Sequence, residues 1–86
     1  VKEKRMQGDF NVFPNPVLDL LNCLFEKHQY DKIEIYKVLV EIIYSEHIKN
    51  QSVMNINLSS VTAGYYLFKI TNEKNKISFT KKIIKL

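Results

Sequence analysis

The chain contains few of the residues on which several classes of protein depend. Its 86 residues include one cysteine, no tryptophan, two glycines and two prolines. The single thiol, Cys23, rules out a disulfide within the chain and a cysteine-rich metal site. Its apolar neighbours in residues 20–25 predict a small buried hydrophobe instead. No apolar run approaches the roughly 18–20 residues of a membrane-spanning helix.

Residues 1–9 are polar, follow neither a helical nor a strand period and contain no hydrophobic region typical of a secretory signal peptide. We interpret them as a linker. The chain begins with Val1 rather than Met, so we expect any export signal to lie upstream on a longer protein. Residues 10–86 then form one domain, near the lower size limit for independent folding.

The positive charge is unevenly distributed. Residues 1–68 contain seven Lys/Arg and eight Asp/Glu, whereas residues 69–86 contain six Lys and one Glu. The net charge of +4 therefore comes from the C-terminal segment alone. Such an asymmetry fits an acidic partner or an anionic surface.

Apolar residues with period two predict strands along most of the chain. In the two cleanest strands the predicted inward residues are Met54, Ile56, Leu58, Tyr66, Phe68 and Ile70. Residues 19–25 have apolar side chains on both faces, with Leu21, Cys23 and Phe25 on one face and Leu20 and Leu24 on the other. This predicts a strand that is covered on both sides. Residues 72–76 are turn formers and predict a hairpin loop.

Pro14-Asn15-Pro16 follows the short apolar run of residues 10–13. Each proline fixes φ and removes an N–H donor, so the tripeptide cannot lie inside a strand ladder. We expect a rigid turn that leaves an edge strand.

Residues 33–46 also fit a helix, because Ile35, Val38, Leu39, Ile42 and Ile43 follow helical spacing. The density of β-branched and aromatic residues, the lack of an N-cap and the alternating start of the stretch favour strands. The whole pattern predicts an all-β, antiparallel β-sandwich of about seven strands, with turn signals every 8–12 residues.

Four blocks, in order and correctly spaced over residues 10–86, resemble the signature of the C-terminal sorting domains of the type IX (Por) secretion system, type A. The blocks are Asn11-Val12-Phe13-Pro14-Asn15-Pro16 with Asp19 and Leu21, Ile33-Glu34-Ile35-Tyr36, Leu58 to Ile70 around Ala63-Gly64-Tyr65-Tyr66, and Lys81-Lys82-Ile83-Ile84-Lys85. The resemblance implies an immunoglobulin-like sandwich that is a sorting signal, not an enzyme, and that needs no cofactor.

The resemblance also implies the partners of the domain. A cargo upstream in the same chain would cross the inner membrane by the general route. Translocon and shuttle proteins would then recognise the domain at the outer membrane, and the cargo would reach the cell surface or the medium. In the family a sortase usually removes the domain and joins the cargo to an anionic surface lipopolysaccharide, which places the cut in or before the linker.

The candidate recognition residues each have a structural alternative. They are Pro14, Asn15, Pro16, Gly64, Tyr66, Lys81, Lys82 and Lys85. The prolines also end a strand, a glycine at a strand start often supplies φ > 0, and Tyr66 lies on a predicted core face. Lysines near the end of an edge strand normally form a solvated edge that blocks unwanted sheet pairing.

One part of the chain departs from the family pattern. After its Ile-Tyr pair the family usually has Asp, an apolar residue and then Gly before Lys or Arg, but this chain has Lys37, Val38, Val40 and Glu41 in those places. Without glycine, the turn there has no residue that is free to adopt φ > 0.

Other functions are weaker alternatives. His28 and His47 have no metal-ligand spacing, no nucleophile elbow is present, and both histidines are expected at the surface. One alternative is a carbohydrate- or protein-binding sandwich. Another is a binder of single-stranded nucleic acid, which would use the basic tail and aromatic residues. The aromatic residues fall mostly on predicted core faces, so we predict no nucleic-acid partner. Edge strands predict a possible homodimer.

Overall fold

The computed structural model describes residues 10–26, 29–37 and 41–86, and the predicted linker at residues 1–9 lies outside them. Within the described ranges the regular structure consists of seven strands. They are β1 (Phe10–Phe13), β2 (Leu20–Phe25), β3 (Lys32–Lys37), β4 (Ile42–His47), β5 (Val53–Asn57), β6 (Gly64–Asn72) and β7 (Ile77–Lys85). No helix that could span a membrane occurs in this part of the chain. The predicted all-β class is confirmed.

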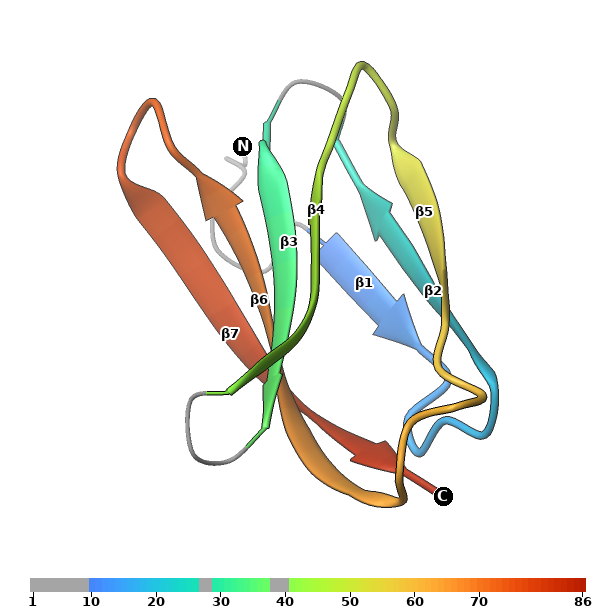
Figure 1. Ribbon diagram of the computed structural model, residues 1–86. Coiled ribbons are helices and arrows are strands. Elements are labelled where there is room, and N and C mark those ends of the chain that lie inside the picture. The colour runs from blue at the N-terminus through green and yellow to red at the C-terminus, as the bar shows by residue number, and fades with distance from the viewer. Residues whose placement is uncertain (1–9, 27–28, 38–40) are drawn as a thin grey trace, which may run out of the picture.

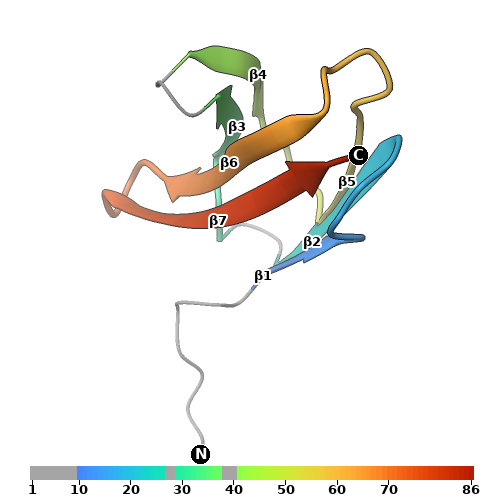
Figure 2. The same cartoon turned by 90° about the horizontal axis from the view of Figure 1, so that it is seen from below.

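The strands form two antiparallel sheets that pack face to face (Figures 1 and 2). The three-stranded sheet has the order β1-β2-β5, and the four-stranded sheet has the order β4-β3-β6-β7. Neighbours that are not consecutive in sequence show that the chain crosses between the sheets, as in immunoglobulin-type sandwiches. The first and last strands both lie at sheet edges, as the sequence predicted.

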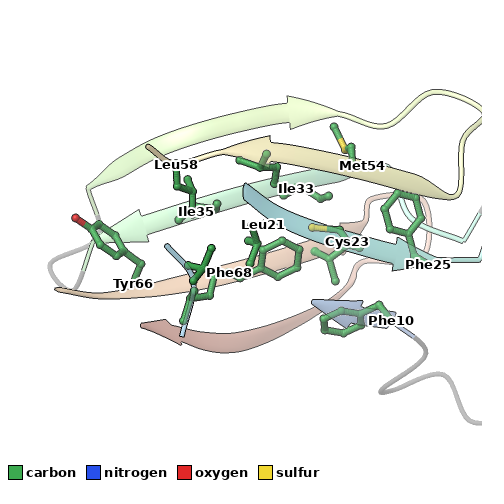
Figure 3. Close-up of a cluster of buried hydrophobic side chains, with 14 of the residues drawn as sticks. Phe10, Leu21, Cys23, Phe25, Ile33, Ile35, Met54, Leu58, Tyr66 and Phe68 are labelled. Atoms are coloured by element: carbon green, nitrogen blue, oxygen red, sulfur yellow. The ribbon is translucent and has the colours of Figure 1, made fainter. Parts of the chain in front are cut away.

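A continuous apolar core fills the space between the sheets, with Tyr66 at one end and Phe10 at the other (Figure 3). The predicted inward residues of β5 and β6 are all at least 93% buried, and Phe68 and Ile70 are completely buried. Burying one such side chain contributes about 1.5–3 kcal/mol. The period-two pattern therefore identified the core faces of these two strands correctly.

The expectation that β2 is covered on both faces is wrong. Leu21 and Cys23 point into the core, but the side chains on the other face, Leu20 and Leu24, are 47% and 40% exposed. The reason is that the sandwich has only two layers, so nothing in the described structure covers the outer face of the three-stranded sheet.

The helical alternative for residues 33–46 is also wrong, because residues 33–37 lie in β3 and residues 42–46 lie in β4. The two strands pair with a register shift between Ile35 and Tyr36, and the N–H of Lys37 donates to the carbonyl of Glu41 at 2.7 Å. The positions of Val38 and Val40, where the family pattern is not met, lie outside the described residues.

The hairpin between β6 and β7 occurs where the turn-forming residues predicted it. Lys76 has φ of 56°, and the Asn72 side chain accepts a hydrogen bond from the N–H of Asn75 at 3.1 Å. The hairpin fixes a continuous pairing of β6 with β7 from Gly64–Lys85 to Asn72–Ile77. That register determines which residues of the two C-terminal blocks meet.

Candidate recognition site

The Pro14-Asn15-Pro16 segment is where the chain changes sheets. β1 pairs with β2 in the three-stranded sheet and ends at Phe13. After the two prolines, Val17 forms a parallel bridge with Lys85 at the edge of the four-stranded sheet. Both proline peptide bonds are cis. The predicted turn at the end of an edge strand is confirmed, but the sequence did not predict that the chain rejoins the other sheet.

Four hydrogen bonds, which we call the clasp, join residues 15–17 to residues 82–86. The Asn15 side chain donates to the carbonyl of Lys82 and accepts from the N–H of Ile84, each at 2.9 Å. The Val17 N–H donates to the carbonyl of Ile84 at 2.8 Å, and its carbonyl accepts from the N–H of Leu86 at 2.9 Å. The opening and closing blocks of the sequence signature are therefore in direct contact.

Gly64 begins β6 with φ of 149°, a region that side chains with Cβ rarely adopt. A Cβ built on Gly64 meets no heavy atom within 4 Å. The backbone conformation rather than a lack of space therefore favours glycine here, and the predicted φ > 0 is confirmed. Gly64 pairs with Lys85 in the register of β6 and β7, so it lies beside the clasp.

Tyr66 is 4% exposed, and its hydroxyl donates to the carbonyl of Thr62 at 2.6 Å. The ring thus fills one end of the core while its polar atom is satisfied by the chain that enters β6 (Figure 3). A tyrosine that bonds the backbone a few residues upstream at the start of this strand is typical of immunoglobulin-like sandwiches. The prediction that Tyr66 belongs to the core is confirmed.

The three C-terminal lysines lie in three different environments. Lys81 points inward at the edge, with Nζ 5.2 Å from the centre of the Phe10 ring, and Lys82 points outward, with Nζ 4.9 Å from the centre of the Tyr65 ring. Lys85 is only 7% exposed, and its Nζ donates to the carbonyl of Leu86 at 2.9 Å. The expectation of one solvated edge is wrong for Lys85, because Val17 pairs with this part of β7.

Two residues near this site were missing from the sequence prediction. Val17 is fully buried and carries the backbone half of the clasp. Tyr65 is 58% exposed and borders a hollow of about 370 Å³ that is lined by Lys37, Glu41 and residues 62–66. The apolar character of Val17, directly after Pro16, could have indicated its burial. The period-two pattern indicates only that Tyr65 faces outward.

Among the described residues, the remaining candidates for chemistry do not come together. Cys23 is 1% exposed, so the predicted buried cysteine is confirmed, and its burial raises the pKa of the thiol to about 12. His47 is exposed at the end of β4, and His28 lies outside the described residues. Within the described parts of the chain, no three metal-ligating side chains come together.

The predicted recognition residues come from three blocks, and all of them except Lys81 meet at one end of the sandwich. The clasp brings Asn15 to Lys82, and the pairing of β6 with β7 places Gly64 opposite Lys85 and Tyr66 opposite Ile83. Lys81 lies further along β7, opposite the buried Phe68. In Figure 2 the C-terminal end of β7 lies near β2 and β5 of the three-stranded sheet.

Comparison with known proteins agrees with the family resemblance of the sequence. A family model described as "Secretion system C-terminal sorting domain" matches residues 11–86. Ulvan lyase NLR42 of Nonlabens ulvanivorans is 26% identical over 73 residues, which are 85% of this chain and 14% of that protein. An endo-acting ulvan lyase of Formosa agariphila is 29% identical over 79 residues, which are 92% of this chain and 15% of that protein. The chain thus spans about one seventh of these curated relatives. Because the family model covers nearly the whole chain, the protein belongs to the family of secretion system C-terminal sorting domains.

Proposed function

We propose that residues 10–86 direct an attached cargo protein across the outer membrane through the type IX secretion system, and that residues 1–9 link the two. The observation that carries the proposal is the clasp, because it joins two blocks of the sorting signature that lie 67–69 positions apart. In both relatives the matched part is joined to a much larger remainder, the arrangement expected of a sorting domain on a cargo.

The proposed partners are the translocon and its shuttle proteins. The motif residues have two roles in this proposal. Pro14, Asn15, Pro16 and Lys82 are exposed and available for contact. Gly64, Tyr66 and Lys85 shape the same end of the domain from within, and Lys81 covers the Phe10 ring.

The test is a reporter with its own export signal, fused ahead of residues 1–86 and produced in a cell that has the type IX system. We expect the reporter at the cell surface or in the medium. The same fusion in a strain without the translocon, and the reporter alone in the competent strain, are expected to stay in the periplasm. Retention of the fusion in the competent strain would remove the sorting function.

We further propose that a sortase cuts the chain in or before residues 1–9 and attaches the cargo to surface lipopolysaccharide. Mass spectrometry of the delivered reporter is the measurement. The expected product lacks residues 10–86 and carries added lipopolysaccharide. Delivery of the uncut fusion would leave sorting intact and exclude the processing step.

A second candidate function is a carbohydrate- or protein-binding module. The exposed Tyr65 ring beside the hollow favours it, because an aromatic residue with an apolar body and a polar tip is suited to contact a partner. For a binding module, Tyr65→Ala would abolish binding of the isolated domain to cell-surface polysaccharide or protein. The reporter fusion would then stay in the periplasm.

A further inference from the structure

Asn15 takes the place of a strand residue at the edge of β7. In an antiparallel edge strand, the N–H and C=O groups that point away from the sheet need a neighbour. The carbonyl of Lys82 and the N–H of Ile84 point toward this open edge, and the two polar atoms of the Asn15 amide bond them at 2.9 Å each. Pro14 and Pro16 have no N–H group to donate. The side-chain amide of Asn15 supplies the donor instead.

The clasp contacts a residue that presents a positive charge on the outer face of the four-stranded sheet. Lys82 lies opposite Leu67 on β6, and its Nζ lies 4.9 Å from the centre of the exposed Tyr65 ring. On one side β7 is held by β6, and on the other side Asn15 holds the carbonyl of Lys82. The backbone of Lys82, from which the ammonium group reaches the ring, is therefore held on both sides.

We propose that Asn15 is a positioning residue of the sorting signal, which holds Lys82 and Tyr65 as a contact surface for an acidic protein partner. This rests on the proposed function. The partner is acidic because residues 69–86 contain six lysines and one glutamate, and complementary charge steers association and rejects wrong partners. The exposed Tyr65 and Leu67 supply the apolar area that such a contact buries.

The first experiment tests the clasp by amide hydrogen exchange. Asn15→Ala removes both side-chain hydrogen bonds, and we expect the amide of Ile84 to exchange about tenfold faster or more. Asn15→Asp keeps the acceptor for Ile84 but loses the donor to Lys82, so the amide of Ile84 is expected to stay protected. Asn55→Ala is the matched control, because Asn55 is also exposed and has a side-chain hydrogen bond, 2.7 Å to Asn22. It is expected to leave Ile84 unchanged.

The second experiment is a double-mutant cycle on export of the reporter fusion. We expect Asn15→Ala and Lys82→Glu each to lower export about fivefold or more, and the double variant to be no worse than Lys82→Glu alone, because the two residues act through one contact. Lys82→Arg and Asn55→Ala are expected to export normally. A purely structural role of Asn15 would instead lower export further in the Lys82→Glu background.

The outcomes separate the two proposals. If the unmodified fusion is not exported, the sorting function fails. If it is exported and Asn15→Ala is exported equally well, or if the two effects add, only the positioning role is overturned. Melting curves of all variants show whether the fold persists. Should Asn15→Ala fail to fold, Asn15→Asp takes its place in the cycle, and normal export of that variant would overturn the positioning role.

Discussion

The inner faces of the two sheets both contribute apolar side chains to one core, whereas their outer faces differ. On the three-stranded sheet the outward residues of the described strands carry no charge, and they are Asn11, Phe13, Leu20, Asn22, Leu24, Val53, Asn55 and Asn57. On the four-stranded sheet the outward residues of β3, β6 and β7 include charged and aromatic side chains, and these are Lys32, Glu34, Tyr36, Tyr65, Lys69 and Lys82.

This difference supports the contact surface proposed above. A core needs only apolar side chains of the right volume, so both inner faces meet the same requirement in the same way. An outer face has no such requirement, and its chemistry is free to follow function. Two cation–aromatic pairs, Lys82 with Tyr65 and Lys69 with Tyr36, lie on the four-stranded sheet. The clasp joins the edge of this same sheet, on which the proposed contact surface lies.

The largest expected effect tests whether the inner faces are equivalent. Leu21→Ala and Phe68→Ala remove fully buried side chains from opposite sheets, and each is expected to lower the free energy of unfolding by about 2–5 kcal/mol. Leu24→Ala and Leu67→Ala are matched controls on the outer faces and should cost less than about 1 kcal/mol. Urea unfolding is the measurement. Two separate transitions, one for each sheet, would contradict a shared core.

The next effect concerns the backbone at the start of β6. Gly64→Val is expected to lower the free energy of unfolding by about 1–3 kcal/mol, because φ of 149° is unfavourable for a residue with Cβ although the space is open. Gly64→Ala should cost almost as much, since the strain comes from Cβ itself. Ala63→Val is the neighbouring control. Thermal melting of Gly64→Val at the temperature of the original chain would show that the positive φ is not required.

The inner face of the three-stranded sheet can be examined further through the pH dependence of Cys23. Burial raises the pKa of its thiol to about 12, whereas the unfolded chain has an ordinary thiol of pKa near 8.5. The unfolded state therefore loses its proton first as pH rises, and stability falls by up to about 1.4 kcal/mol per pH unit between about pH 9 and pH 12. Below this window the thiol contributes no pH dependence. Cys23→Val should show a shallower loss in urea unfolding at pH 8–11, and an identical slope would mean that water reaches the thiol.

The fold followed from local patterns, and the site did not. Period-two alternation found the inward faces of β5 and β6 because each of these strands buries one side only. It failed at β2, where Leu20 and Leu24 are apolar and yet exposed, because alternation cannot tell whether a second layer exists. The prolines predicted the end of β1, since a missing N–H is a local property.

The clasp could not be predicted from local sequence patterns. Its hydrogen bonds connect residues that are 67–69 positions apart. An asparagine side chain that bonds a strand edge in place of a strand backbone produces no periodic pattern in the sequence. Lys85 shows the same limit, because a lysine near a strand end is predicted to be solvated unless another segment is known to cover it. Family resemblance named most of these residues without giving the contacts that unite them.

The smallest expected effect is weak self-association, and it distinguishes the open edges of the two sheets. Exposed strand edges pair with other chains unless charge or a covering segment prevents it. The edge of β7 is partly closed by the clasp and carries Lys81 and Lys82, whereas β5 (Val53–Asn57) is an edge strand without charge. We therefore expect a weak dimer at high concentration that forms through β5. Asn55→Lys should abolish it, because the new charge lies on the pairing strand, while Thr80→Lys on β7 should not. Light scattering over a range of concentrations is the measurement, and a strict monomer, or a dimer that survives Asn55→Lys, would contradict this assignment.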